Sequence, residues 1–409
     1  MSNNKLLVKD KVLITTVFLY LAYTLFPVLR DLLPLPTGLL NVLVPVMIVL
    51  LEPKSVQNRP FIWFVIYMIV LLIYVGAGKD LPTMGIAEYD SHRLIIIEGG
   101  FIAPALTIWS VLKSRNKYQL YKAVTVISLF FIIIELFYLT PLVLTNSNLL
   151  RSTVEGYYNY SFIGIPRYSY VHAIVLITPV LLFAVFHCHY LRKIGILLVL
   201  LSFTIIVFKS DVTTIIIIFV VDVILSFFFY YTKNNVTLII ITFFILSTIL
   251  VLYATGAIDW FFERISDLAN GTSFSNKMKS VGSHFSGDEY NGGTYNERLG
   301  LHRESWKAFT NNIITGSTPV GNHSSILDRL GGLGLIGFVP YICIFTTFIK
   351  RERKNLSSLM VRRFFYLVTG STFLLLYQKG LFGEEGWLFF LVICPSYFNM
   401  YMMRNSNQI

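Results

Sequence analysis

The sequence contains few charged residues. Asp, Glu, Lys and Arg together make up 13% of its 409 residues, whereas hydrophobic residues make up 55%. In soluble domains, about a quarter of the residues are charged. The composition therefore excludes an ordinary water-soluble protein and favours a membrane protein.

Cysteine is also scarce. The three cysteines, Cys188, Cys343 and Cys394, all lie in or beside apolar runs, which excludes a disulfide framework and a zinc site built from cysteine. His187, Cys188 and His189 are adjacent, and adjacent residues of a helix point in different directions, so no metal site is expected there. No DxD-like pair of carboxylates is present to hold Mg²⁺ for a nucleotide sugar. The sequence predicts neither a metal nor a cofactor.

Long apolar runs dominate the chain. A run of about 18 or more apolar residues is typical of a transmembrane helix. The predicted spans are 12–29, 38–51, 61–75, 94–112, 121–144, 170–186, 194–208, 212–231, 236–253, 326–349, 364–377 and 387–401. The fold class expected is therefore an all-α polytopic membrane protein with about 12 transmembrane helices.

The positive charges predict the orientation. A net charge of +11 would suggest nucleic acid as partner in a soluble protein, but here the question is which side of the membrane holds the positives. With the N-terminus inside, more than half of the 33 Lys and Arg residues fall on the cytoplasmic side. We expect both termini in the cytoplasm, membrane lipid around the spans, and no nucleic-acid partner.

One connection is far longer than the others. We expect residues 1–409 to form a single membrane domain, in which residues 254–325 make a long extracytoplasmic loop between helices 9 and 10. No internal repeat is visible, which argues against a transporter built from repeated halves.

The end of this loop predicts an amphipathic helix near 295–313. Thr294 and Glu297 have the spacing of a capping box, which places the helix start at Tyr295. One stripe of this helix carries Tyr295, Leu299, His302, Trp306, Phe309 and Ile313. Arg298 and Arg303 flank the stripe, and two interpretations are open. The arginines anchor a helix on the membrane surface, or they bind a lipid-linked diphosphate through bidentate hydrogen bonds.

A turn with Gly316, Gly321 and His323 follows this helix. Ser325 and Asp328 also have capping-box spacing, which places His323 at the outer mouth of the tenth helix. A helix N-terminus disfavours the imidazolium, so the ring is expected to be neutral and able to act as a base, while free amides there can hold phosphate oxygens. The alternative is a histidine that only caps the helix.

These residues resemble the long-loop signature of the O-antigen ligase/polymerase superfamily. The resemblance rests on Arg298 and Arg303 before Trp306, the turn 316–321, His323-Ser-Ser-Ile-Leu, and the glycine-rich stretch 331–337. The long loop between helices 9 and 10 is similar too. Ser324 stands where the family usually has Asn. Glycines 332, 334 and 337 also match a dinucleotide-binding pattern, but no strand precedes them, so close helix packing is the better interpretation.

The resemblance implies a metal-independent glycosyltransferase of the GT-C type. Such an enzyme acts on undecaprenyl-diphosphate-linked glycans at the outer face of the bacterial inner (cytoplasmic) membrane, with its active site facing the periplasm or exterior. His323 then corresponds to the family's essential loop histidine and is the expected catalytic base. Arg298 or Arg303 corresponds to the diphosphate-binding arginine, and the motif does not decide between them.

Further candidates lie outside the motif. Arg151 and Arg167 are in a second external loop that resembles another functional loop of the family, although Arg167 could equally be an interfacial anchor. Lys209 lies in a tight turn where many relatives carry Ser-Arg one position later. Glu98, near the outer end of its span, is a possible secondary carboxylate, because an ionisable residue inside a membrane is a functional candidate by default. Glu297 in the long loop is the other possible secondary carboxylate.

The function expected is polymerisation of lipid-linked oligosaccharide repeat units into O-antigen or capsular-type polysaccharide, for lipopolysaccharide or a related surface glycan. Donor and acceptor are both undecaprenyl-diphosphate-linked glycans, and a chain-length regulator and a flippase are possible partners. Two alternatives stay open. One is a ligase that transfers the glycan to lipid A-core. The other is a flippase or transporter for the same lipid-linked units.

Overall fold

The computed structural model describes most of the chain. The residues described are 8–33, 37–82, 91–146, 149–152, 164–165, 168–188, 190–210, 212–232, 234, 237, 263–267, 275, 294–378 and 382–406. Every regular element within them is helical, and no strand occurs among them.

The described helices follow one another closely along the chain. The first are α1 (Val8–Leu25), α2 (Pro27–Leu32), α3 (Thr37–Leu51), the 3-10 turn η1 (Pro53–Val56), α4 (Arg59–Gly76), α5 (Ser91–Arg115) and α6 (Tyr118–Thr145). Next come α7 (Leu149–Ser152), α8 (Tyr168–Ile174), the 3-10 turn η2 (Val175–Ile177), α9 (Thr178–His187), α10 (Tyr190–Lys209) and α11 (Thr213–Tyr231). The last are α15 (Thr294–Asn311), α16 (Ser325–Asn355), α17 (Leu359–Gln378), α18 (Gly383–Leu388), the π-helical turn η3 (Phe389–Ile393) and α19 (Cys394–Ser406).

The lengths and composition of these helices match a membrane environment. Eight helical stretches in the described part of the chain are long and apolar enough to cross a membrane, and α3 is a shorter apolar helix. The prediction of a polytopic α-helical membrane protein is confirmed at this level. Eleven of the predicted spans overlap described helices, and the ninth, 236–253, lies outside the described residues except for residue 237.

Several predicted spans are interrupted rather than continuous. The first divides into α1 and α2 before Pro27, the sixth passes through η2 before Pro179, and the last contains the π-helical turn η3. A proline removes one backbone hydrogen bond from a helix, which accounts for the interruptions before Pro27 and Pro179. The π-helical turn η3 is a local insertion within an α-helix.

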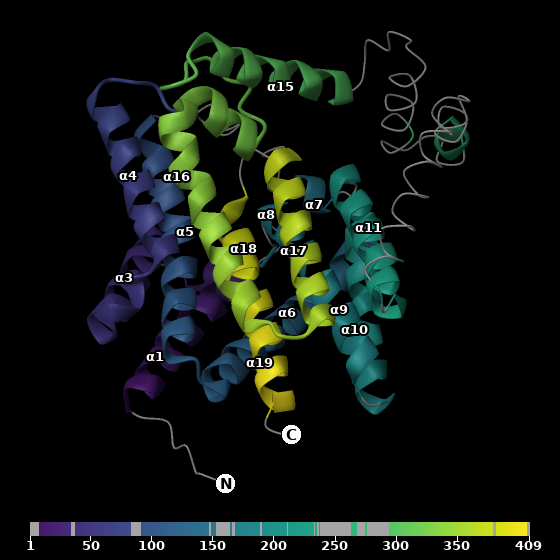
Figure 1. Cartoon of the computed structure of the whole chain (residues 1–409). Helices are drawn as coiled ribbons and strands as arrows, with labels where there is room; N and C mark the ends of the chain where they lie inside the picture. Colours follow the sequence, from purple (N-terminus) through teal and green to yellow (C-terminus); the bar gives the residue numbers. More distant parts are fainter. Residues whose placement is uncertain are drawn as a thin grey trace.

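The helices stand side by side in one bundle, with α15 lying across one end (Figure 1). The start of α1 and the end of α19 lie at the opposite end. The described ends of the chain are therefore on the far side of the bundle from α15.

Aromatic side chains fill the bundle between α16, α17 and the final helices. Trp387 stacks on Phe345 with ring centroids 5.1 Å apart, and Phe348 meets Phe390 edge-on at 5.2 Å. All four side chains are buried. These rings pack Phe345 and Phe348 of α16 against α18 and η3.

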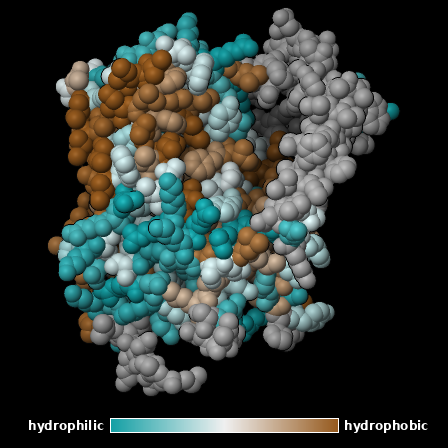
Figure 2. Space-filling model, viewed as in Figure 1, coloured by the Kyte–Doolittle hydropathy of each residue, from teal (hydrophilic) through white to brown (hydrophobic). Residues whose placement is uncertain are grey.

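The outer surface is strongly apolar over α4 and α16. Figure 2 shows hydrophobic side chains gathered there, above a hydrophilic zone nearer the end that holds the chain termini. The exposed apolar residues on α4 and α16 are Ile62, Val65, Ile66, Ile69, Leu72, Ile73, Leu335, Ile336 and Val339. A soluble protein rarely exposes so continuous a patch, whereas lipid covers it without cost.

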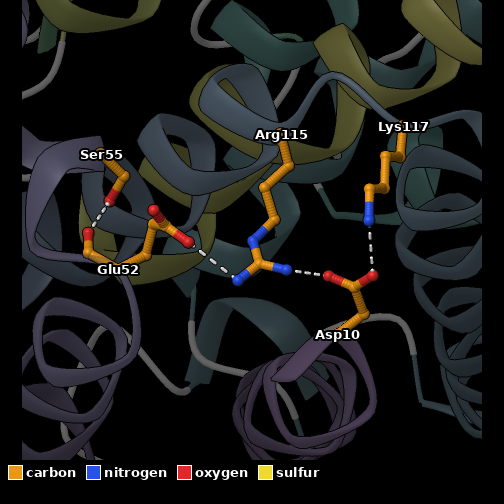
Figure 3. Close-up of polar contacts among 5 residues, drawn as sticks. All are labelled: Asp10, Glu52, Ser55, Arg115 and Lys117. Atoms are coloured by element: carbon orange, nitrogen blue, oxygen red, sulfur yellow. Dashed lines mark hydrogen bonds and ion pairs between the residues drawn. The ribbon is translucent and has the colours of Figure 1, made fainter. Parts of the chain in front are cut away.

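Ion pairs connect the helices at the end of the bundle that holds the described chain ends. Asp10 of α1 is buried and accepts hydrogen bonds from Arg115 and from Lys117 Nζ, the latter at 2.8 Å (Figure 3). Arg115 Nη2 also donates to Glu52 Oε2 at 2.8 Å. These contacts connect α1, the end of α3 and the α5–α6 turn.

Candidate active site

The turn between α15 and α16 is held in place by backbone and side-chain hydrogen bonds. Ser317 donates from its amide to the Gly331 carbonyl at 2.9 Å and from its hydroxyl to the Ala308 carbonyl at 2.7 Å. The turn is thereby attached to both helices. A loop fixed in this way can present a side chain in one defined position.

Helix α16 is broken at Gly334, and the residues that lead into the turn form hydrogen bonds to the backbone at this break. Gly334 has φ +58°, a conformation that favours glycine, so the helix divides into a short first part and a long second part. The amides of Leu335 and Ile336, which start the second part, donate to the carbonyls of Ile313 and Ile314 at 2.9 and 3.1 Å. The predicted span 326–349 lies within α16, which is long and apolar enough to cross a membrane, and the sequence did not predict the break inside it.

The first part of α16 is capped by Ser324. The Ser324 hydroxyl accepts from the Leu327 amide at 3.1 Å, and the Ser324 amide donates to Asp328 Oδ2 at 2.8 Å. The predicted cap at Ser325 was therefore wrong by one residue, because Asp328 pairs with the residue four positions before it. His323, which is half-buried, comes directly before the cap, at the positive end of the short helix.

A chain of hydrogen bonds connects this cap to α15. Ser305 donates its hydroxyl to Asp328 Oδ1 at 2.6 Å and accepts from the Gly321 amide at 2.9 Å. Ser305 and Asp328 are both buried. At Gly321 an added Cβ would overlap the Leu301 carbonyl, so only glycine allows the turn to lie this close to α15.

The α4 end supports the same turn from the other side. Lys79 Nζ donates to the carbonyls of Thr315 and Gly316, the latter at 3.0 Å. Tyr74 donates its hydroxyl to the Leu333 carbonyl at 3.0 Å, immediately before the break in α16. Partial burial lowers the pKa of Lys79 from its ordinary value. The lysine thus satisfies carbonyl groups that the end of α15 and the turn leave without helical partners.

A buried ion pair lies beneath the first part of α16. Arg329 pairs with Glu98 of α5, and both side chains are almost completely buried. The guanidinium also donates to the Tyr67 hydroxyl at 3.3 Å and lies 4.5 Å from the Tyr341 ring centroid. Glu98 was predicted as a possible secondary carboxylate facing the site; in the structure its Oε1 binds Arg329.

Helix α15 covers this arrangement and coincides closely with the predicted helix 295–313. The side that packs on α16 carries Ser305 and Ala308, which are buried. Trp306, expected on the membrane-facing stripe, is 53% exposed and contacts Phe309. Trp306 and Phe309 of the stripe therefore lie beside the packed face of α15.

The two arginines of α15 differ in environment. Arg298 is half-buried, lies one turn before His302, and lowers the pKa of that histidine together with burial, which is the larger cause. His302 in turn contacts the ring of Tyr377 at the end of α17, with centroids 5.0 Å apart. Arg303 is exposed. Arg298 is therefore the arginine on the side that faces the bundle.

The other predicted candidates are not brought to this turn by any described contact. Lys209, at the end of α10, and Glu297 are exposed. Arg167 lies outside the described residues, and Arg151 lies in α7 with its side chain outside them. Most of the loop 254–325 before α15 also lies outside them.

Asp222 lies within the membrane-spanning stretch of α11 and has a structural partner. Its Oδ1 accepts from the Ser371 hydroxyl at 2.6 Å, which joins α11 to α17. In the described part of the chain, no group of three or more His, Cys, Asp or Glu side chains is arranged to hold a metal ion.

The structure adds residues that the sequence did not single out. Arg329 binds Glu98 and the Ser325 carbonyl, and Ser305 binds Asp328 and the Gly321 amide. His302 lies one turn after Arg298, whose charge acts on it. A second buried polar cluster joins α2, α3 and α18, where Arg30 lies 3.8 Å from Glu385 and Asn41 donates to Glu384 at 3.3 Å. The four-residue spacing of Arg298 and His302 was the one signal in the sequence that could have paired them.

Comparison with known proteins gives no identification. No protein-family model matches the chain, and no curated protein matches it. An imidazole beside a helix N-terminus is a group that can accept a proton from a hydroxyl, and an arginine on the neighbouring helix is a group that can stabilise an anionic leaving group.

Proposed function

We propose that the protein is a metal-independent glycosyltransferase of the GT-C type that polymerises undecaprenyl-diphosphate-linked repeat units. The observation that carries the proposal is the fixed turn 316–324, which presents His323 at the N-terminus of α16 beneath α15. It lies at the end of the bundle opposite the described chain ends (Figure 1). With both termini in the cytoplasm and twelve spans, that end faces the periplasm or exterior.

In the proposed reaction His323 acts as the general base. It removes the proton from a hydroxyl of the acceptor sugar as that oxygen forms a bond to the donor's anomeric carbon. The bond from this carbon to the diphosphate breaks, and the lipid diphosphate leaves with the electron pair. The proton stays on His323 until it passes to solvent or to the diphosphate, and no metal or soluble energy source enters the balance.

Arg298 is the proposed diphosphate ligand. Negative charge accumulates on the departing diphosphate, and a guanidinium together with the free amides of a helix N-terminus stabilises such charge. Arg298 is half-buried on the side of α15 that faces the bundle, whereas Arg303 is exposed. This difference supports Arg298 as the ligand and Arg303 as a surface anchor.

The supporting network has a positioning role in this proposal. Ser305, Asp328 and Gly321 hold the turn against α15, and Lys79 holds it against the end of α4. Catalytic side chains need supporting contacts that keep them within a fraction of an ångström of a productive position. A flexible loop would not keep His323 in one position, and these hydrogen bonds support such a position.

The experiment that tests the proposal is deletion of the gene followed by gel analysis of the surface polysaccharide. Loss of a polymerase leaves acceptors capped by single repeat units. Loss of a ligase, which would use the same His323 chemistry with a lipid A-core acceptor, leaves bare lipid A-core and polymer still on undecaprenyl diphosphate. Loss of a flippase leaves no repeat units on the outer face. Only the first pattern agrees with the proposal.

A further inference from the structure

A basic cavity lies at the end of the bundle that holds the described chain ends. It has a volume of about 880 Å³ and is formed by the start of α4, the end of α16 and the start of α17. Its basic lining residues are Arg59, Lys350, Arg351, Arg353, Lys354 and Arg362. Among the described residues, no Asp or Glu lines it.

The walls of this cavity are fixed by contacts to the core. Asn58 caps α4 by accepting from the Phe61 amide at 3.2 Å, and it donates to the Ser110 hydroxyl of α5 at 2.9 Å. Arg351 lies over the ring of Trp109 at 5.5 Å, and that indole donates to Glu352 at 2.7 Å. The start of α4 and the end of α16 both contact α5. These two walls of the cavity therefore have a defined position.

No acidic residue of the described chain neutralises the charges of the cavity. Basic residues close by have acidic partners: Lys113 pairs with Glu352 at 3.0 Å, and Arg115 and Lys117 pair with Glu52 and Asp10 (Figure 3). None of the six basic cavity residues has an ion pair with an acid of the described chain. Concentrated, unpaired positive charge around a concave surface attracts an anion.

The position of the cavity indicates the kind of anion. The exposed apolar surface of α4 begins directly beside it at Ile62, Val65 and Ile66, and Figure 2 shows the hydrophilic zone meeting this apolar patch. A ligand with a phosphate head and acyl chains can occupy both at once, with its chains along α4. Arginine and lysine side chains suit phosphate oxygens, arginine through its fork and lysine as a point charge.

We propose that this cavity binds the phosphate headgroup of an anionic membrane phospholipid. The volume of about 880 Å³ is ample for a headgroup with two phosphates. Basic pockets between transmembrane helices on the cytoplasmic side bind such headgroups in other proteins. The site lies at the opposite end of the bundle from His323, so it stands independently of the proposed glycosyl transfer.

The test measures lipid binding to the whole protein after detergent delipidation. Native mass spectrometry follows the binding of added cardiolipin, with phosphatidylcholine as the neutral lipid and soluble pyrophosphate as the competitor. The cavity variant is Arg353→Gln/Lys354→Gln, because both side chains are exposed and their loss leaves the core intact. The matched control is Lys122→Gln/Arg404→Gln, which removes the same charge at exposed positions outside the cavity lining.

We expect cardiolipin to bind in preference to phosphatidylcholine, and the cavity variant to weaken cardiolipin binding at least about tenfold. The control variant should change it less than about twofold. Equal losses in the two variants would show that general surface charge holds the lipid and would overturn the proposal. Tight binding of pyrophosphate that displaces cardiolipin would also overturn it, because the site would then serve a soluble phosphate.

Discussion

Arg329 of α16 and Glu98 of α5 form an ion pair inside the bundle, where their side chains are 2% and 3% exposed. Arg329 belongs to the first part of α16 and lies within two helical turns of His323. Tyr67 and Tyr341 complete the surroundings of the guanidinium through a hydrogen bond and a ring contact. The pair thereby fixes the short helix whose N-terminus carries the proposed base.

Removing one partner of this pair should be far more damaging than removing both. We expect Glu98→Gln to lower the free energy of unfolding by about 3–5 kcal/mol, because it leaves a buried guanidinium without a counter-charge. The double variant Glu98→Gln/Arg329→Met should recover most of that loss. Denaturant unfolding in detergent measures both. A double variant no more stable than the single one would contradict the role given to the pair.

Gly321 should be intolerant of any side chain. Gly321→Ala places a Cβ against the Leu301 carbonyl, so the turn must move away from α15 and His323 moves with it. We expect loss of long-chain polymer while the protein still accumulates in the membrane. Gly300→Ala is the matched control, since a Cβ there meets open space within α15. Alanine at that helical position should be neutral or stabilise by about 0.5–1 kcal/mol. Full polymer from Gly321→Ala would show that the close approach of the turn to α15 is not needed for polymer formation.

The docking of α15 should weaken at acidic pH through His302. Burial, and secondarily the charge of Arg298, lower the pKa of His302, so the docked state disfavours the imidazolium. The stabilisation is present above the ordinary histidine pKa of about 6.5 and is lost as the pH falls towards the lowered folded value. The fluorescence of Trp306 on the same helix reports the change. His302→Phe keeps an aromatic ring beside Tyr377 but cannot be protonated, so it should remove this part of the pH dependence. An unchanged pH profile in that variant would assign the transition to another group.

The sequence predicted the membrane class, the positions of most helices and the helix α15 because these depend on local composition. Runs of apolar residues specify spans, and the period of the stripe specifies a surface helix. It could not predict which face of α15 would pack, because Ser305 and Ala308 are small residues whose importance comes from the close approach of α16. Apolar periodicity gives weight to Trp306 and Phe309 instead.

The sequence also missed the break at Gly334 and the partner of Glu98. A glycine with positive φ is not distinguishable from a packing glycine in a single sequence, since both occur in membrane helices. No motif in the sequence singled out Arg329. Its pairing with Glu98 joins residues far apart in the chain, and only the packing of α5 against α16 brings them together.

The two arginines of α15 should differ in function. We expect Arg298→Gln to lower polymer formation by about a hundredfold, the cost typical of removing one donor from a site that stabilises developing negative charge. Arg298→Lys should recover little of it, because lysine cannot form the bidentate contact. Arg303→Gln is the matched change on the exposed side of the same helix and should leave polymer length and amount close to normal. The reverse pattern would assign the diphosphate to Arg303.

The most direct test of the central claim is polymer formation by His323 variants, measured as the amount and length of surface polysaccharide at equal protein levels. Loss of a general base typically costs about 10² to 10⁴ in rate, so His323→Ala should abolish visible long-chain polymer. His323→Gln should fail as well, because glutamine forms hydrogen bonds but takes no proton at neutral pH. His187→Gln, on α9 beside Phe183, is the control for a histidine outside the site and should behave as the unchanged protein. Normal chain length from His323→Gln would contradict the account, because His323 would then only position the acceptor or cap the turn.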